Sequence, residues 1–147
     1  MNGDARCYCV SFTEPGAVFD LTYEFSRKVV ALIESTDTFS VFSISPTPTA
    51  IAWADTHSLN AIHADLLRIQ DAAGCRIIAT AGDAIRGNVG SQQRFDFSVV
   101  GHPLALLREA TMGLPDSTSW LAADVAKELG LSSAEVRAIE GDEFCVW

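Results

Sequence analysis

Apolar and polar positions follow two different periods along the chain, which predicts strands alternating with helices. Residues 7–13 are mostly apolar, as in a strand, and Pro15-Gly16 ends this segment. Residues 17–35 place apolar side chains every three or four positions, which is typical of a helix with one buried face. That stripe consists of Val18, Leu21, Phe25, Val29 and Leu32.

A hairpin and a second helix are predicted next. Residues 39–45 alternate apolar and polar side chains, prolines at 46 and 48 favour a turn, and residues 50–54 return as a strand. Residues 57–73 repeat the helical stripe, with Asp55 or Thr56 as the N-terminal cap and Gly74 as the C-terminal cap.

The second half continues the alternation. Strands are predicted over 75–81 and 95–100, with Gly82 and Gly87 between them as turn and bulge residues. Helices are predicted from Pro103 and over 121–129, and two short strands close the chain at 136–139 and 144–147. This order predicts a ferredoxin-like α+β fold, a mainly antiparallel sheet with helices packed on one face.

Composition favours one folded domain over residues 1–147, because 48% of the residues are hydrophobic. The formal net charge of −9 disfavours nucleic acid as a partner. No apolar run reaches the roughly 18 residues that a membrane span needs. The N-terminus does not resemble a signal peptide, so we expect a cytoplasmic protein, or the cytoplasmic part of a larger one.

The cysteines and histidines do not form metal-binding patterns. Cys7 and Cys9 are spaced too closely for a C-x2-C site, and in a strand they would face the same side. We expect reduced, half-buried thiols. His57 and His63 lie six positions apart on the predicted helix, which is not the spacing of a metal pair.

Two other motifs resemble known nucleotide-binding signatures but do not match them, one in its residues and the other in its position. Gly82 and Gly87 have the spacing of a phosphate loop, but Asn88 and Val89 replace the lysine and the hydroxyl residue that must follow. The string Glu-Gly-Asp-Glu-Phe at 140–144 resembles the signature of diguanylate cyclases, yet it lies between the two closing strands. We interpret it as a turn.

The segment from Arg76 to Ala110 carries a more specific pattern. It contains Ala81-Gly82, Gly-Asn-Val-Gly-Ser at 87–91, and Arg-Phe-Asp-Phe-Ser-Val-Val-Gly at 94–101. This stretch resembles the catalytic domain of class III adenylyl and guanylyl cyclases. The resemblance implies conversion of ATP or GTP to a cyclic nucleotide by two metal ions, held by two aspartates, in a site between two protomers.

The residues that such an enzyme needs are replaced here. The positions of the two metal aspartates correspond to Ser11 and Thr49, and the base-reading position corresponds to Ser98. The asparagine that positions the ribose and the arginine that stabilises the transition state correspond to Ala105 and Glu109. We therefore predict no catalytic residues and no metal or other cofactor.

The resemblance implies a catalytically degenerate cyclase-like domain that serves as a dimerisation, regulatory or ligand-sensing module. Its partner would be a second copy or another cyclase-like domain, with a nucleotide or small molecule as a further ligand. Two alternatives stay open. One is an active cyclase using Mg²⁺ or Mn²⁺, and the other is a purely structural domain of a larger protein.

Overall fold

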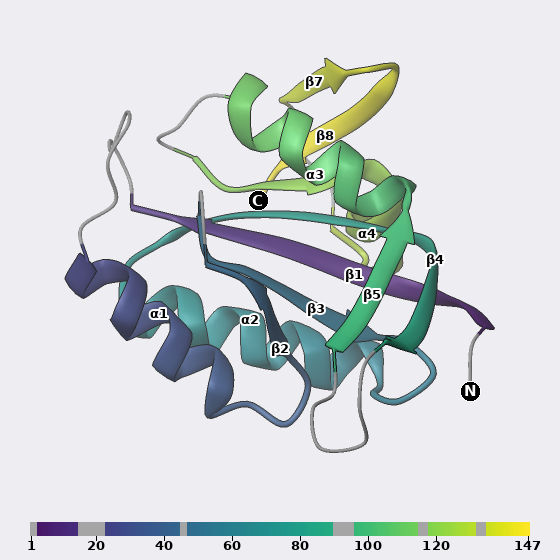
Figure 1. Ribbon diagram of the computed structural model, residues 1–147. Coiled ribbons are helices and arrows are strands. Elements are labelled where there is room, and N and C mark those ends of the chain that lie inside the picture. The colour runs from purple at the N-terminus through teal and green to yellow at the C-terminus, as the bar shows by residue number, and fades with distance from the viewer. Residues whose placement is uncertain (1–2, 15–22, 45–46, 90–95, 115–117, 132–134) are drawn as a thin grey trace.

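A computed structural model describes residues 3–14, 23–44, 47–89, 96–114, 118–131 and 135–147 (Figure 1). The helices are α1 (Tyr23–Glu34), α2 (Leu59–Ala73), α3 (His102–Gly113) and α4 (Ala123–Glu128). The strands are β1 (Gly3–Thr13), β2 (Ser40–Ser43), β3 (Thr49–Trp53), β4 (Arg76–Val89), β5 (Asp96–Gly101), β6 (Trp120–Ala122), β7 (Val136–Ile139) and β8 (Asp142–Val146). No helix within these ranges is long and apolar enough to cross a membrane.

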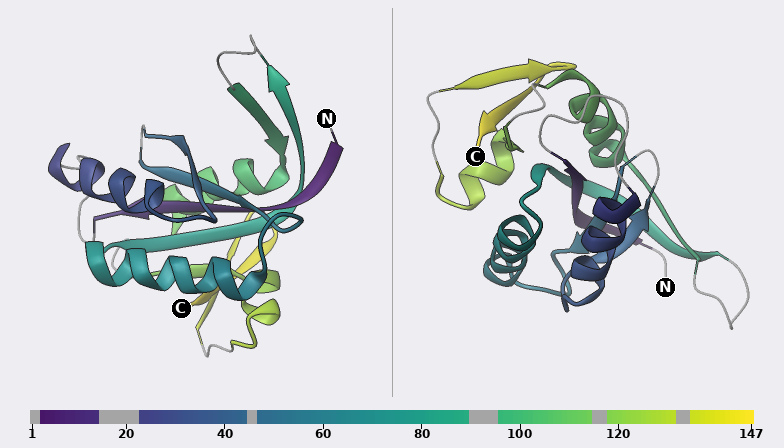
Figure 2. Two further views of the ribbon diagram at one scale, coloured as in Figure 1. Left: turned by 90° about the horizontal axis from the view of Figure 1, so that it is seen from below. Right: turned by 90° about the vertical axis from the view of Figure 1, so that its left-hand side faces the viewer.

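The strands form one sheet, in the order β2-β3-β1-β4-β6-β8-β7, with β5 paired to β4 outside this path. Every pairing is antiparallel except that of β4 with β6. Figure 2 shows β4 and β5 extending from the body of the domain as a two-stranded arm. The mainly antiparallel α+β sheet predicted from the sequence is confirmed.

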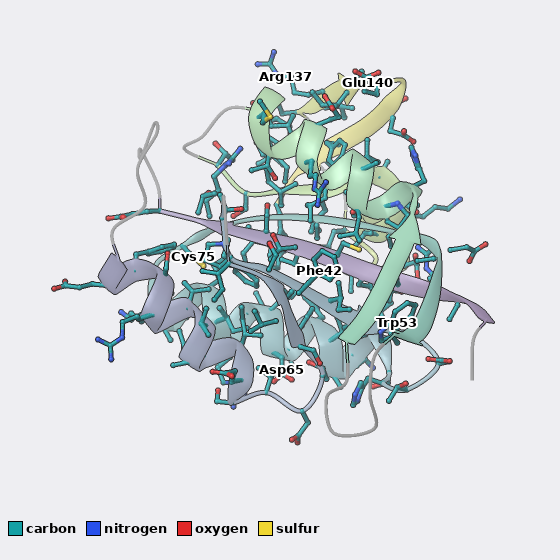
Figure 3. The ribbon with its side chains drawn as sticks, in the orientation of Figure 1. Phe42, Trp53, Asp65, Cys75, Arg137 and Glu140 are labelled. Carbon is teal, nitrogen blue, oxygen red and sulfur yellow. The ribbon has the colours of Figure 1, made fainter. Side chains whose placement is uncertain are left out.

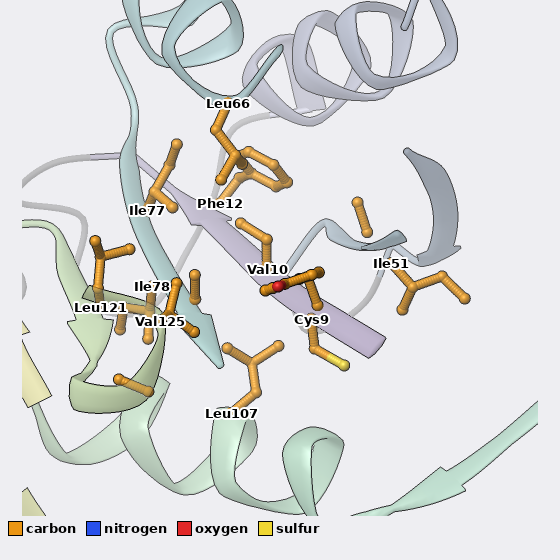
Figure 4. Close-up of a cluster of buried hydrophobic side chains, with 14 of the residues drawn as sticks. Cys9, Val10, Phe12, Ile51, Leu66, Ile77, Ile78, Leu107, Leu121 and Val125 are labelled. Atoms are coloured by element: carbon orange, nitrogen blue, oxygen red, sulfur yellow. The ribbon is translucent and has the colours of Figure 1, made fainter. Parts of the chain in front are cut away.

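The central strand β1 has two different faces. Tyr8, Val10 and Phe12 point to one side, where Figure 4 shows Phe12 beside Leu66 of α2. Cys9 alternates with them and points to α3 on the opposite side (Figure 4). The prediction of helices on one face alone is therefore wrong. Helices α1 and α2 cover one face, and α3 packs against β1 and β4 on the other (Figure 1).

Helix α4 lies on the same face as α1 and α2. The Tyr8 hydroxyl donates a hydrogen bond to the Glu128 carboxylate at 2.7 Å, and Arg6 pairs with Asp124 at 3.3 Å and with Glu128. Arg6 and Tyr8 lie on the same face of β1 as Val10, because alternate side chains of a strand point to the same side. Their contacts with Asp124 and Glu128 therefore place α4 on that face.

The helix predicted over 121–129 begins with a strand instead. Residues 120–122 form β6, in which Trp120 is fully buried and pairs with Ile78 of β4. Only 123–128 are helical. Three apolar residues carry too little periodicity to separate a strand from a helix, and the pairing with β4 decides between them.

Gly82 and Gly87 are not turn residues, because both lie within the 14-residue strand β4. β4 pairs with β1 from Arg76 to Arg86 and with β5 from Ala84 to Val89. These backbone hydrogen bonds offset the weak strand propensity of glycine. At Gly82 an added Cβ would lie 3.3 Å from Pro103, so the glycine also lets the start of α3 approach the strand.

The turn predicted for residues 140–144 is confirmed only at its first two residues, because Asp142–Val146 form β8. Glu140 and Gly141, at the predicted turn, have positive φ angles of 51° and 85°. His57 precedes α2 instead of lying on it. It therefore does not share a helix with His63, whose ring lies 5.9 Å from that of Trp147.

All four cysteines are free thiols. Cys7, Cys9 and Cys75 are fully buried, deeper than the half-buried state predicted for them, and Cys145 is partly exposed. The predicted common side of Cys7 and Cys9 is confirmed, with 3.7 Å between their sulfur atoms. The hydrogen bond between these two thiols, together with burial, raises the pKa of the Cys9 thiol. Burial raises the pKa of the Cys75 thiol to about 11. Neutral, buried thiols of this kind are poor nucleophiles.

Helix α2 is capped at both ends, but Ser58 and not Asp55 or Thr56 caps the N-terminus. The Ser58 hydroxyl accepts a hydrogen bond from the backbone N–H of Ala61 at 3.2 Å. Gly74 ends the helix with φ of 62°, as predicted. The cap lies later than predicted because the segment 54–56 is used for the turn that follows β3.

Replacing Ser58 by alanine should lower the free energy of unfolding by about 1 kcal/mol, because the Ala61 N–H loses its partner. Urea unfolding followed by circular dichroism measures this loss. Thr56→Ala is the matched control and should change stability by less than about 0.5 kcal/mol. Equal losses for the two variants would contradict the assignment of Ser58 as the cap.

Candidate functional site

A pocket of about 160 Å³ lies between α3 and the hairpin of β2 and β3, on the face of the sheet that α3 covers. Its apolar walls are Phe42, Leu104, Leu107 and Met112. Figure 3 shows Phe42 on the hairpin, toward α3. The remaining lining residues are five hydroxyl side chains and one cation, namely Ser11, Ser43, Thr47, Thr49, Thr111 and Arg108.

Strand pairing brings Ser11 and Thr49 together in this pocket. They are direct partners in the antiparallel register of β1 and β3. Side chains in such a pair point to the same face, with Cβ atoms about 4.5–5.5 Å apart. Two positions that are 38 residues apart in the sequence thus lie side by side. Both are the positions to which the resemblance assigns the metal aspartates of a cyclase.

The hydroxyl of Ser11 is used within the fold. Thr111 Oγ1 donates a hydrogen bond to the Leu107 carbonyl at 2.7 Å, as a helical threonine commonly does. Ser11 Oγ lies 2.9 Å from Thr111 Oγ1 and therefore donates to it. Ser11 is only 2% exposed, so this hydrogen bond satisfies a buried hydroxyl and ties β1 to α3.

Thr49 is used in a similar way. Its hydroxyl donates to the backbone carbonyl of Thr47 at 3.2 Å, within the hairpin turn. The two side chains at the centre of the pocket are therefore neutral donors. A divalent cation instead prefers carboxylate oxygens in this kind of site. Within the described part of the chain no three His, Cys, Asp or Glu side chains gather into a possible metal site.

Arg108 is the one charged side chain among the lining residues that the structure describes. It is exposed, and it forms no ion pair with any residue that the structure describes. The sequence pattern did not identify Thr111, Phe42 or Arg108 as pocket residues. The helical spacing of Leu104, Leu107 and Thr111 could have placed Thr111 on the face of α3 that meets the sheet.

Two further predicted positions lie outside the pocket. Ala105 and Glu109 are both exposed and stand four residues apart on α3, so they share one outward face of that helix. Ser98 lies on β5, where it pairs with Gly87 of β4, and the structure describes only its backbone. Within one chain the structure therefore brings together Ser11 and Thr49, but not Ala105 or Glu109 with them.

The link between Ser11 and Thr111 can be measured with a double-mutant cycle. Thr111→Val should lower the free energy of unfolding by about 1–3 kcal/mol, because it leaves the Ser11 hydroxyl buried without an acceptor. Ser11→Ala should cost about 1 kcal/mol. The double variant should cost less than the sum of the single variants, by about 1 kcal/mol. Additive losses in urea unfolding would contradict the hydrogen bond.

Comparison with known proteins gives different answers for sequence and for structure. No protein-family model matches the chain, and no curated protein sequence matches it either. The adenylyl cyclase CyaB of P. aeruginosa superimposes with a TM-score of 0.63 at 12% identity, over 100% of this chain and 96% of that one. The dimeric guanylyl cyclase domain of the RhoGC fusion protein of the aquatic fungus Blastocladiella emersonii gives 0.68 at 8% identity, over 99% and 95%.

A third solved structure is the guanylate cyclase domain of RhGC from Catenaria anguillulae in complex with GTP. It gives a TM-score of 0.67 at 9% identity, over 99% of this chain and 98% of that one. These superpositions extend over almost the whole length of both chains. The chain therefore has the fold of class III adenylyl and guanylyl cyclase catalytic domains.

Proposed function

We propose that the chain is a catalytically inactive domain of the cyclase fold that acts in signalling, as a dimerisation, regulatory or ligand-sensing module. The observation that carries the proposal is the pair of Ser11 and Thr49. The resemblance assigns both metal aspartates to these positions, and the strand register makes them direct partners. Neutral hydroxyls there do not supply the charge that holds two divalent ions.

The outward face of α3 supports the same proposal. The resemblance assigns the ribose-positioning asparagine to Ala105 and the arginine of the transition state to Glu109. Alanine has no donor for the ribose, and a carboxylate repels the triphosphate at the point where a cation would lower the barrier. Neither half of a shared site is then complete, so pairing with an active domain does not restore activity.

The proposed partner is a second copy of this chain or another cyclase-like domain. Ala105 and Glu109 support this, because both are exposed on α3 and available to a neighbouring domain. We propose the cytoplasm as the compartment, where three buried free thiols and a fourth, partly exposed one stay reduced.

Incubation of the purified chain with ATP or GTP and Mn²⁺ should give no cyclic nucleotide above a protein-free blank. Chromatography with mass detection measures the product. An active cyclase domain assayed in parallel serves as the positive control. Cyclic AMP or cyclic GMP formed in proportion to protein concentration would refute the proposal and establish the active-cyclase alternative.

A gain-of-site variant tests the assignment of Ser11 and Thr49 directly. The double variant Ser11→Asp/Thr49→Asp should bind Mn²⁺ at least about tenfold more tightly than the wild type, because two facing carboxylates gain from a cation between them. Electron paramagnetic resonance of free Mn²⁺ measures the binding. The matched control, Ser35→Asp/Thr56→Asp, adds the same charge at exposed positions and should bind Mn²⁺ like the wild type. Equal binding by the two double variants would contradict the assignment.

A further inference from the structure

The pocket between α3 and the hairpin has the lining of a binding site for a small organic molecule. Leu104 and Leu107 are buried and form its floor on the α3 side. Phe42 closes it from β2, and Met112, 87% exposed, stands at its edge. A flexible thioether at the edge of an apolar pocket can adapt to ligands of different shapes.

The polar side chains that line the pocket are hydroxyls, apart from that of Arg108. The hydroxyls of Ser11 and Thr49 already donate to Thr111 and to the Thr47 carbonyl. A hydroxyl oxygen that donates one hydrogen bond still accepts others, but among the described lining residues only Arg108 carries a positive charge. The described residues that line the pocket include no carboxylate to neutralise this cation.

The volume limits the size of the ligand. A cavity of about 150 Å³ holds one benzene molecule, so the 160 Å³ pocket accommodates a body of about six carbon atoms. A nucleoside triphosphate is far larger, and it carries charge that a single arginine does not balance.

We propose that this pocket binds a small monocarboxylate whose apolar body lies against Leu104, Leu107 and Phe42 and whose carboxylate pairs with Arg108. An exposed guanidinium that pairs with no carboxylate of the described ranges, at the rim of an apolar pocket, matches a ligand with one anionic end. The inference deepens the proposed function, since it names the ligand class of a site that holds hydroxyls in place of metal ligands. Aliphatic and aromatic acids share this chemistry, and the test separates them.

Nuclear magnetic resonance titrations with hexanoate and benzoate, each against its neutral amide, test the proposal. The wild type should bind one or both acids with a dissociation constant on the order of 1 mM or below. Each acid that binds should do so about tenfold more tightly than its amide, because of the charge-assisted pair with Arg108. Perturbed resonances should include Thr111 and Leu107, at the pocket.

Arg108→Gln should remove the preference for the acid over the amide while keeping the binding of the apolar body. Arg68→Gln is the matched control, because Arg68 is an exposed arginine of α2, on the opposite face of the sheet. It should keep the tenfold preference. Thr49→Phe should fill the pocket and abolish binding. If the Thr49→Phe variant does not fold, Ser43→Phe on the edge strand serves as the pocket-filling variant.

Three results would overturn the inference. The first is that neither hexanoate nor benzoate binds to the wild type. The second is that the wild type binds acid and amide equally well. The third is that the Arg108→Gln variant keeps the preference for the acid over the amide. The cyclic-nucleotide assay on the same sample distinguishes failure of the proposed function from failure of the ligand assignment. Product formed from ATP or GTP refutes that function whatever the acids do, whereas loss of acid binding without product refutes only the ligand assignment.

Discussion

The hydrogen-bonded pairing of β1 with β4 on one side and β3 on the other organises the rest of the domain. Residues Gly3–Thr13 pair in register with Arg76–Arg86, and Cys7–Ser11 pair with Thr49–Trp53. A shift of one residue would exchange the two faces of β1 and bury the wrong side chains. The register is fixed because both faces are covered, with Phe12 packed toward α2 and Cys9 toward α3 (Figure 4).

The same register creates the pocket and sets its chemistry. It places Ser11 opposite Thr49, and α3 covers the resulting pair from one side with Leu107 and Thr111. Two carboxylates at this distance would repel each other unless a cation lay between them. Two hydroxyls have no such requirement, and hydrogen bonds to Thr111 and to the Thr47 carbonyl satisfy them within the chain. Neither hydroxyl therefore needs a cation as a partner at this position.

The scaffold and the proposed loss of activity are compatible because they depend on different residues. Superposition on cyclase domains at 8–12% identity requires only that the apolar alternation of the strands and the faces of the helices persist. Of the positions at issue, Ser11 is buried and is held by its hydrogen bond to Thr111, whereas the two positions on α3 lie at the surface. Ala105 and Glu109 are exposed on α3, so their identity has little effect on packing, whereas Phe12 or Trp120 is fully buried.

The sequence by itself determined the order of helices and strands apart from β6, the mainly antiparallel sheet and the resemblance around residues 87–101, because local periodicity and glycine positions encode them. It misplaced Gly82 and Gly87, the cap of α2 and β6, where pairing with distant strands overrides local propensity. The two faces of the sheet were also decided only by tertiary structure. So was the pocket, because no local pattern relates Arg108 and Thr111 on α3 to Phe42 on the hairpin. Only the strand register and the packing of α3 bring these side chains together.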